Sequence, residues 1–85
     1  MDLEDTLIEP LFMDGLSVPL IRLTTEEMPP RAEVRLRDQS YHYERSYPIK
    51  GYSAVMPGYL REQMATGKKP LLVERDTRYY VYFAA

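Results

Sequence analysis

The fold is decided by residues 52–83, which read YSAVMPGYLREQMATGKKPLLVERDTRYYVYF. This stretch predicts a short helix from Pro57 to about Thr66. Proline suits the first helical turn, where its missing N–H has no partner, and Gly67 suits the left-handed position that closes a helix. The apolar side chains that recur at i, i+4 spacing and form the expected buried stripe are Met56, Leu60 and Met64.

The second half of the same stretch predicts a β-hairpin. Residues 71–73 are apolar, residues 74–77 form a charged turn, and residues 78–83 are rich in β-forming side chains. Alternation in the last strand divides it into two faces. The first face, expected to be core, holds Tyr79, Val81 and Phe83. The second face holds Arg78, Tyr80 and Tyr82.

Upstream, Asp14-Gly15 lies between two apolar runs, and this is the strongest short signal for a hairpin. A two-residue turn would pair Met13 with Leu16, Leu11 with Val18, and Pro10 with Pro19. A proline in each arm cannot donate to a ladder, so the hairpin is expected to be twisted, short or at a sheet edge. The alternative is an extended arm that docks on a partner or on a second copy.

A second hairpin is expected after a connection over residues 24–31. Residues 33–37 alternate, with Val34 and Leu36 on one face, and residues 38–40 are turn-like. Residues 41–47 alternate again. One face is expected to hold Tyr41, Tyr43, Arg45 and Tyr47, and the other to hold His42, Glu44 and Ser46.

These segments predict an α+β fold with a small, mostly antiparallel sheet. Two N-terminal hairpins come first, then one helix, then a C-terminal hairpin, and the single helix is expected to cover one face. With 85 residues, the chain is long enough for one domain, residues 1–85. Within it, residues 1–30 form an acidic leader with a frayed start, and residues 31–85 form the main body.

The formal net charge of −2 conceals an asymmetry along the chain. Residues 1–27 carry seven acids and one base, whereas residues 28–85 carry six acids and ten bases. Such a split is typical of a leader that folds over the body, or of a body that faces a polyanion. It also arises when charges simply solvate different surfaces.

The sequence indicates a cytoplasmic protein without a membrane segment. No run approaches the roughly 18 to 20 apolar residues that span a bilayer, and acids stand where a signal peptide needs positive charge. Because there is no cysteine, disulfides and thiolate metal sites are excluded. Small domains without such cross-links often gain stability by oligomerising, and a homodimer is therefore expected.

The sequence gives no basis for a catalytic, cofactor or metal site. One histidine, His42, cannot supply a zinc or non-haem iron site without cysteine, and the isolated glycines form no phosphate loop. A set of Ser40 or Ser46 with His42 and Glu44 would lie on a flat strand that offers no oxyanion hole. We expect His42 to sit in a cross-strand pair instead.

The tyrosines are the most distinctive feature of the composition, because eight of them accompany no tryptophan and two phenylalanines. A tyrosine combines a large apolar ring with a polar tip, and tyrosine and arginine are enriched at binding hot spots. The residues expected to form a Tyr/Arg surface are Arg35, Arg37, Tyr41, Tyr43, Arg45, Tyr47, Arg78, Tyr80 and Tyr82.

Three interpretations of this surface remain open. The rings pack in ordinary cross-strand pairs, or they bind another protein or a second copy, or they stack on single-stranded nucleic acid. Overall acidity disfavours the third. The sequence thus predicts a small non-catalytic interaction module, an accessory or regulatory protein, with nucleic-acid binding as the alternative.

Overall fold

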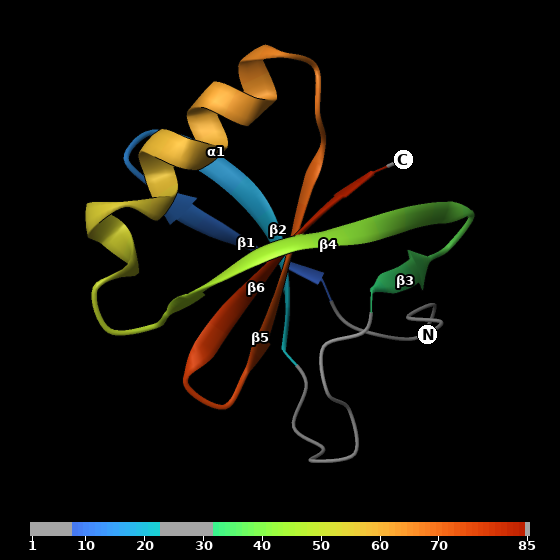
Figure 1. Ribbon diagram of the computed structural model, residues 1–85, viewed down its shortest axis with the longest axis horizontal. Helices are drawn as coiled ribbons and strands as arrows, with labels where there is room; N and C mark the ends of the chain where they lie inside the picture. The colour runs from blue at the N-terminus through green and yellow to red at the C-terminus, as the bar shows by residue number, and fades with distance from the viewer. Residues whose placement is uncertain (1–7, 23–31, 85) are drawn as a thin grey trace.

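The computed structural model describes residues 8–22 and 32–84, which form a sheet of six strands with one helix (Figure 1). In chain order the elements are β1 (Ile8–Met13), β2 (Leu16–Arg22), β3 (Glu33–Leu36), β4 (Gln39–Pro48), a 3-10 turn η1 (Tyr52–Ala54), α1 (Met56–Ala65), β5 (Pro70–Arg75) and β6 (Arg78–Ala84). The predicted fold class, α+β with a mostly antiparallel sheet, is confirmed. The expected frayed terminus and the connection over 24–31 lie outside the described residues.

The strand order is β1-β2-β5-β6-β4-β3, and every neighbouring pair is antiparallel except β2 and β5. The parallel pair brings the N-terminal hairpin against the C-terminal one, across a large separation in sequence. The parallel contact begins with Leu20 opposite Leu72. It begins directly after Pro19, which has no N–H to offer a ladder.

The first hairpin forms with the predicted register. Met13 lies opposite Leu16, and the two prolines lie opposite each other. Asp14 and Gly15 have φ angles of 44° and 81°, as a two-residue turn with positive φ at both positions requires. The extended-arm alternative is therefore wrong for residues 8–22, which are part of the sheet.

The helix begins and ends close to the predicted positions. Pro57 occupies its first turn, and Gly67 follows its end with φ 92°. A non-glycine residue would be strained at that angle, which is why glycine is favoured there. Met56 and Leu60 are fully buried and Met64 is half-buried, so the predicted stripe is the contact face of α1.

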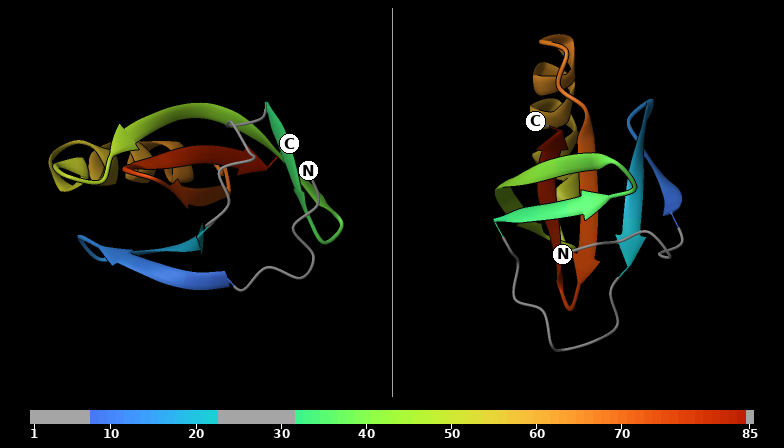
Figure 2. Two further views of the ribbon diagram at one scale, coloured as in Figure 1. Left: turned by 90° about the horizontal axis from the view of Figure 1, so that it is seen from below. Right: turned by 90° about the vertical axis from the view of Figure 1, so that its right-hand side faces the viewer.

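The two faces of the sheet carry separate apolar cores. The face under α1 includes Val18, Leu20, Leu72, Tyr79, Val81 and Phe83 together with Met56 and Leu60. The opposite face includes Ile21, Val34, Leu36, Leu71, Val73 and Tyr82. Figure 2 shows how the second face is covered: β4 arches across the molecule, and β3 lies at the opposite end from α1.

The expectation that Tyr41, Tyr43, Arg45 and Tyr47 share one face is wrong. Tyr43 lies opposite Tyr82, but Arg45 lies opposite Val81, so the register shifts by one residue between them. A β-bulge of this kind inserts one unpaired residue and reverses the alternation beyond it. Arg45 and Tyr47 consequently lie on the α1 side, and Tyr41 and Tyr43 lie on the other.

Candidate functional site

Half-buried tyrosines cluster on the sheet face that α1 does not cover. Tyr41, Tyr43 and Tyr80 pack against the core of this face, and we call these three residues the tyrosine face. The ring centroids of Tyr43 and Tyr80 are 6.1 Å apart. Tyr82 is only 1% exposed and lies beneath them, with its ring centroid 5.5 Å from that of Tyr43 in an edge-on arrangement. The prediction that Tyr82 is available to a partner is therefore wrong, because its ring is part of the core.

Arg78 stands at one end of the tyrosine face. Its Nε donates to Ser46 Oγ at 3.0 Å, and its Nη2 donates to the Ser46 carbonyl at 3.3 Å. Arg75 lies opposite Arg78 in the register of β5 and β6, so both arginines belong to this end of the sheet. The bonds to Ser46 fix the Arg78 side chain beside the tyrosines rather than leaving it to rotate freely.

Arg45 and Tyr47 belong to a different cluster, around Tyr59 of α1. The Arg45 guanidinium carbon lies 4.0 Å from the centre of the Tyr59 ring, a cation–π contact. The Tyr47 ring centroid is 6.0 Å from that of Tyr59. Tyr59 also meets Phe83 edge-on at 6.1 Å. Tyr59 was not predicted as part of the site, although its place one residue before the buried Leu60 puts it at the margin of the helical stripe.

The electrostatics of this cluster follow from burial and proximity. Burial raises the pKa of the Tyr59 hydroxyl, while the neighbouring Arg45 charge opposes that change. The Tyr47 hydroxyl raises the pKa of Arg45, against the opposing effect of desolvation. Among the described residues the Tyr47 hydroxyl is buried and has no hydrogen-bond partner of ordinary geometry.

Arg35 and Arg37 do not join the tyrosine face. Val34 and Leu36 of β3 point into the core of that face, so Arg35 between them points away from it. Arg35 Nε donates to the Arg37 carbonyl at 3.4 Å, and Arg37 is in the turn with φ 55°. His42 lies opposite Glu33, with Nδ1 3.6 Å from Glu33 Oε2, which confirms the predicted cross-strand pair.

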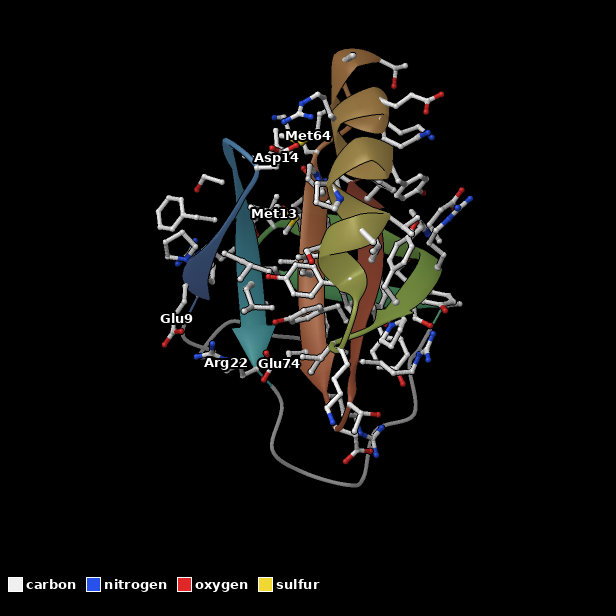
Figure 3. The ribbon with its side chains drawn as sticks, turned by 90° about the vertical axis from the view of Figure 1, so that its left-hand side faces the viewer. Glu9, Met13, Asp14, Arg22, Met64 and Glu74 are labelled. Atoms are coloured by element: carbon white, nitrogen blue, oxygen red, sulfur yellow. The ribbon has the colours of Figure 1, made fainter. Side chains whose placement is uncertain are left out.

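Two further groups of charges tie the N-terminal hairpin to its neighbours (Figure 3). Arg22 bridges Glu9 at 2.7 Å and Glu74 at 3.4 Å, which links β1, β2 and β5. At the other end of the hairpin, Arg61 of α1 donates to the Asp14 carboxylate at 3.1 Å and to the Asp14 carbonyl. The Arg22–Glu74 and Arg61–Asp14 contacts join segments that lie far apart in the sequence, so sequence spacing gave no signal for them. Ion pairs at the surface such as these contribute little to stability.

A hollow of about 440 Å³ lies where β4 ends beside the turn between β5 and β6. It is lined by Pro48, Ile49, Lys50, Asp76 and Thr77. The Ile49 N–H donates to the Thr77 carbonyl at 2.8 Å and holds the two walls together. The lining does not include His42, so the hollow does not bring the histidine together with carboxylates.

The described parts of the chain, residues 8–22 and 32–84, contain no cluster of three or more His, Cys, Asp or Glu side chains suited to a metal ion. Within the same parts, no helix is long and apolar enough to cross a membrane. Comparison with known families, curated proteins and solved structures finds no match to this chain.

Proposed function

We propose that the protein is a small non-catalytic interaction module that binds another protein through the tyrosine face, with Arg78 at its edge. The observation that supports this most directly is the packing of Tyr43 between Tyr80 and the buried Tyr82. Rings held in this way lose little conformational freedom on binding and still present polar tips. Such preorganised aromatic groups beside an arginine are typical of binding hot spots.

The positions of the arginines favour a protein over a nucleic acid. Arg45 is stacked on Tyr59, Arg22 and Arg61 are in ion pairs, and Arg35 points away from the tyrosine face. A single-stranded nucleic acid needs aromatic rings and cations along one continuous track. The described arginines are instead distributed over several sides of the sheet, with Arg75 and Arg78 at one end of the tyrosine face.

The test is to compare two tyrosine variants that differ in position but not in type. Tyr80→Ala removes a half-buried ring from the tyrosine face, and Tyr52→Ala removes one from the α1 side, where it packs edge-on against Tyr79. The tagged wild-type protein is used to capture its partner, which is then purified for titration. We expect Tyr80→Ala to weaken binding by roughly 30-fold, or about 2 kcal/mol, and Tyr52→Ala to change it little.

Circular dichroism of both variants confirms that each is folded before binding is compared. Equal weakening by both variants would contradict the proposal. The proposal would also be contradicted if single-stranded oligonucleotides bound in a salt-sensitive way and Arg78→Ala and Tyr80→Ala abolished this binding. That outcome would assign the surface to nucleic acid.

A further inference from the structure

The two outer strands of the sheet differ in whether they can accept another strand. An outer strand exposes every second pair of backbone N–H and C=O groups, which is a template for strand addition. In β1, the turn pairs Met13 with Leu16 by hydrogen bonds, so Pro10 and Pro19 fall at a non-bonded position of the β1–β2 ladder. The nitrogen of Pro10 therefore lies on the outer side of β1, where it has no hydrogen to donate. This proline interrupts the free edge at its centre.

No proline interrupts the other outer strand, β3. The pairing of Leu36 with Gln39 closes the turn to β4, and alternation then directs the backbone of Val34 toward β4. The bond from the Tyr43 N–H to the Ala32 carbonyl, 2.8 Å, follows the same alternation. The backbone groups of Glu33 and Arg35 consequently face outward. Within the described residues, β4 is the only strand beside β3.

The side chains of these two residues are exposed and carry opposite charges two positions apart. The Glu33 side chain also lies near His42 of β4, on the face of β3 opposite to Val34. An antiparallel copy of β3 centred on Val34 places Glu33 of each chain opposite Arg35 of the other. In this register Glu33 and Arg35 form main-chain hydrogen bonds with the second copy, because their backbone groups face outward. Their opposite side-chain charges also attract each other across the two strands.

We propose that a second copy of this chain pairs with β3 in this register, so that the two sheets continue into one across a twofold axis. The neighbouring registers are less favourable. A shift that pairs Glu33 with itself puts two carboxylates in contact, and a shift that pairs Arg35 with itself does the same for two guanidinium groups. A symmetric dimer uses the same strand from both chains, which is the usual arrangement for a homodimer.

The edge is short, with four residues in β3, so the dimer is weak and concentration-dependent. This dimer does not involve the tyrosine face, because the side chains of Glu33 and Arg35 lie on the other side of β3. Val34, which points inward, is 2% exposed in the single chain, and strand addition leaves it where it is. The interface therefore consists of main-chain hydrogen bonds and the two reciprocal ion pairs.

Charge reversal in separate chains tests the register directly. Glu33→Arg gives a chain whose outer residues are both basic, and Arg35→Glu gives one whose outer residues are both acidic. Each variant alone is expected to dimerise at least roughly tenfold more weakly than the wild type, since like charges then face each other. An equimolar mixture of the two variants is expected to recover a one-to-one dimer, and the double variant E33R/R35E is expected to recover the homodimer.

Sedimentation equilibrium over a range of protein concentrations measures these dissociation constants. The matched control is Glu62→Arg, which makes the same change of charge on the exposed side of α1 and is expected to leave the dimer intact. Raised salt is expected to weaken the wild-type dimer. Three results would each overturn the proposal. The wild-type chain could stay monomeric at the highest concentration, the single variants could dimerise like the wild type, or the mixture could fail to associate. Tyr80→Ala is expected to keep this dimer, so failure here is distinguishable from failure of the proposed function.

Discussion

The two faces of the sheet are closed by different means. On one face α1 lays Met56 and Leu60 onto residues of β2, β5 and β6, and both side chains are fully buried. On the other face the sheet covers itself, because β4 arches and brings Val34 and Leu36 of β3 into the second core (Figure 2). The first closure is supplied by a separate element, and the second by the curvature of the sheet. Both faces keep half-buried side chains at their margins, and on the second face these include Tyr41, Tyr43 and Tyr80.

A bulge in β4 decides on which of these two faces each of its tyrosines lies. The bulge between Tyr43 and Arg45 reverses the alternation along β4. Before the bulge, tyrosines join the face closed by curvature, and after it, Tyr47 joins the face closed by α1. A bulge also bends its strand and increases the local twist, which suits a strand that must arch over the sheet.

The largest effect on this comparison is expected from removing the central contact of α1. Leu60 is 0% exposed, and Leu60→Ala leaves a cavity between the helix and the sheet. Such truncations cost about 2–5 kcal/mol of unfolding free energy, which is a large part of the stability of a chain this small. Urea denaturation followed by circular dichroism measures the change. Met64→Ala, at a half-buried position of the same stripe, is the control and is expected to cost less; an equal cost would show that α1 is not anchored at Leu60.

A smaller effect is expected from the same kind of truncation on the other face. Val34 is 2% exposed, and Val34→Ala removes two methyl groups from the second core, a loss of roughly 1–2 kcal/mol. The same urea titration, at a protein concentration low enough to keep single chains, measures it, with Arg35→Ala as the exposed neighbour on the same strand. If Val34→Ala were no more costly than Arg35→Ala, β3 would not close the second core.

Local signals in the sequence predicted most of the fold, and the reasons are visible in particular residues. Asp14-Gly15 fixed the register of the first hairpin, and Pro57 with Gly67 marked the ends of α1. Each of these signals depends only on neighbours in the chain. The placement of Tyr79, Val81 and Phe83 together on one buried face was also predicted, since alternation holds throughout β6.

The parts that were missed depend on contacts between distant segments. The parallel pairing of Leu20 with Leu72 joins strands that lie far apart in the sequence, and no local pattern specifies such a partner. The Tyr/Arg surface was predicted as one patch because alternation was assumed to continue through Glu44. One extra residue at the bulge divided that patch between both faces, since a shift of one residue exchanges the two sides of a strand. Tyr59 was missed for a related reason, because its contact with Arg45 exists only after this exchange.

The smallest predicted effect concerns alkaline pH, where the face under α1 is expected to respond through Tyr79 and Tyr59. Burial raises the pKa of both hydroxyls above the ordinary value of 10.0, and nearby Glu74 raises that of Tyr79 further. A raised pKa in the folded state means that the native protein releases these protons less readily than the unfolded chain. Their contribution is therefore fully present below pH 10 and is lost as pH rises through the higher folded values.

We expect the unfolding free energy to fall above pH 10, and the double variant Tyr59→Phe with Tyr79→Phe to lose less stability over the same interval than the wild type. Urea denaturation at neutral and alkaline pH measures both changes, and the ultraviolet absorbance of tyrosinate follows the ionisation itself. The difference in unfolding free energy between the double variant and the wild type at neutral pH gives the effect of losing the protonated hydroxyls, and it is subtracted from the difference at alkaline pH. An identical alkaline loss in the double variant and the wild type would contradict the prediction, because it would place the responsible groups outside the core that α1 closes.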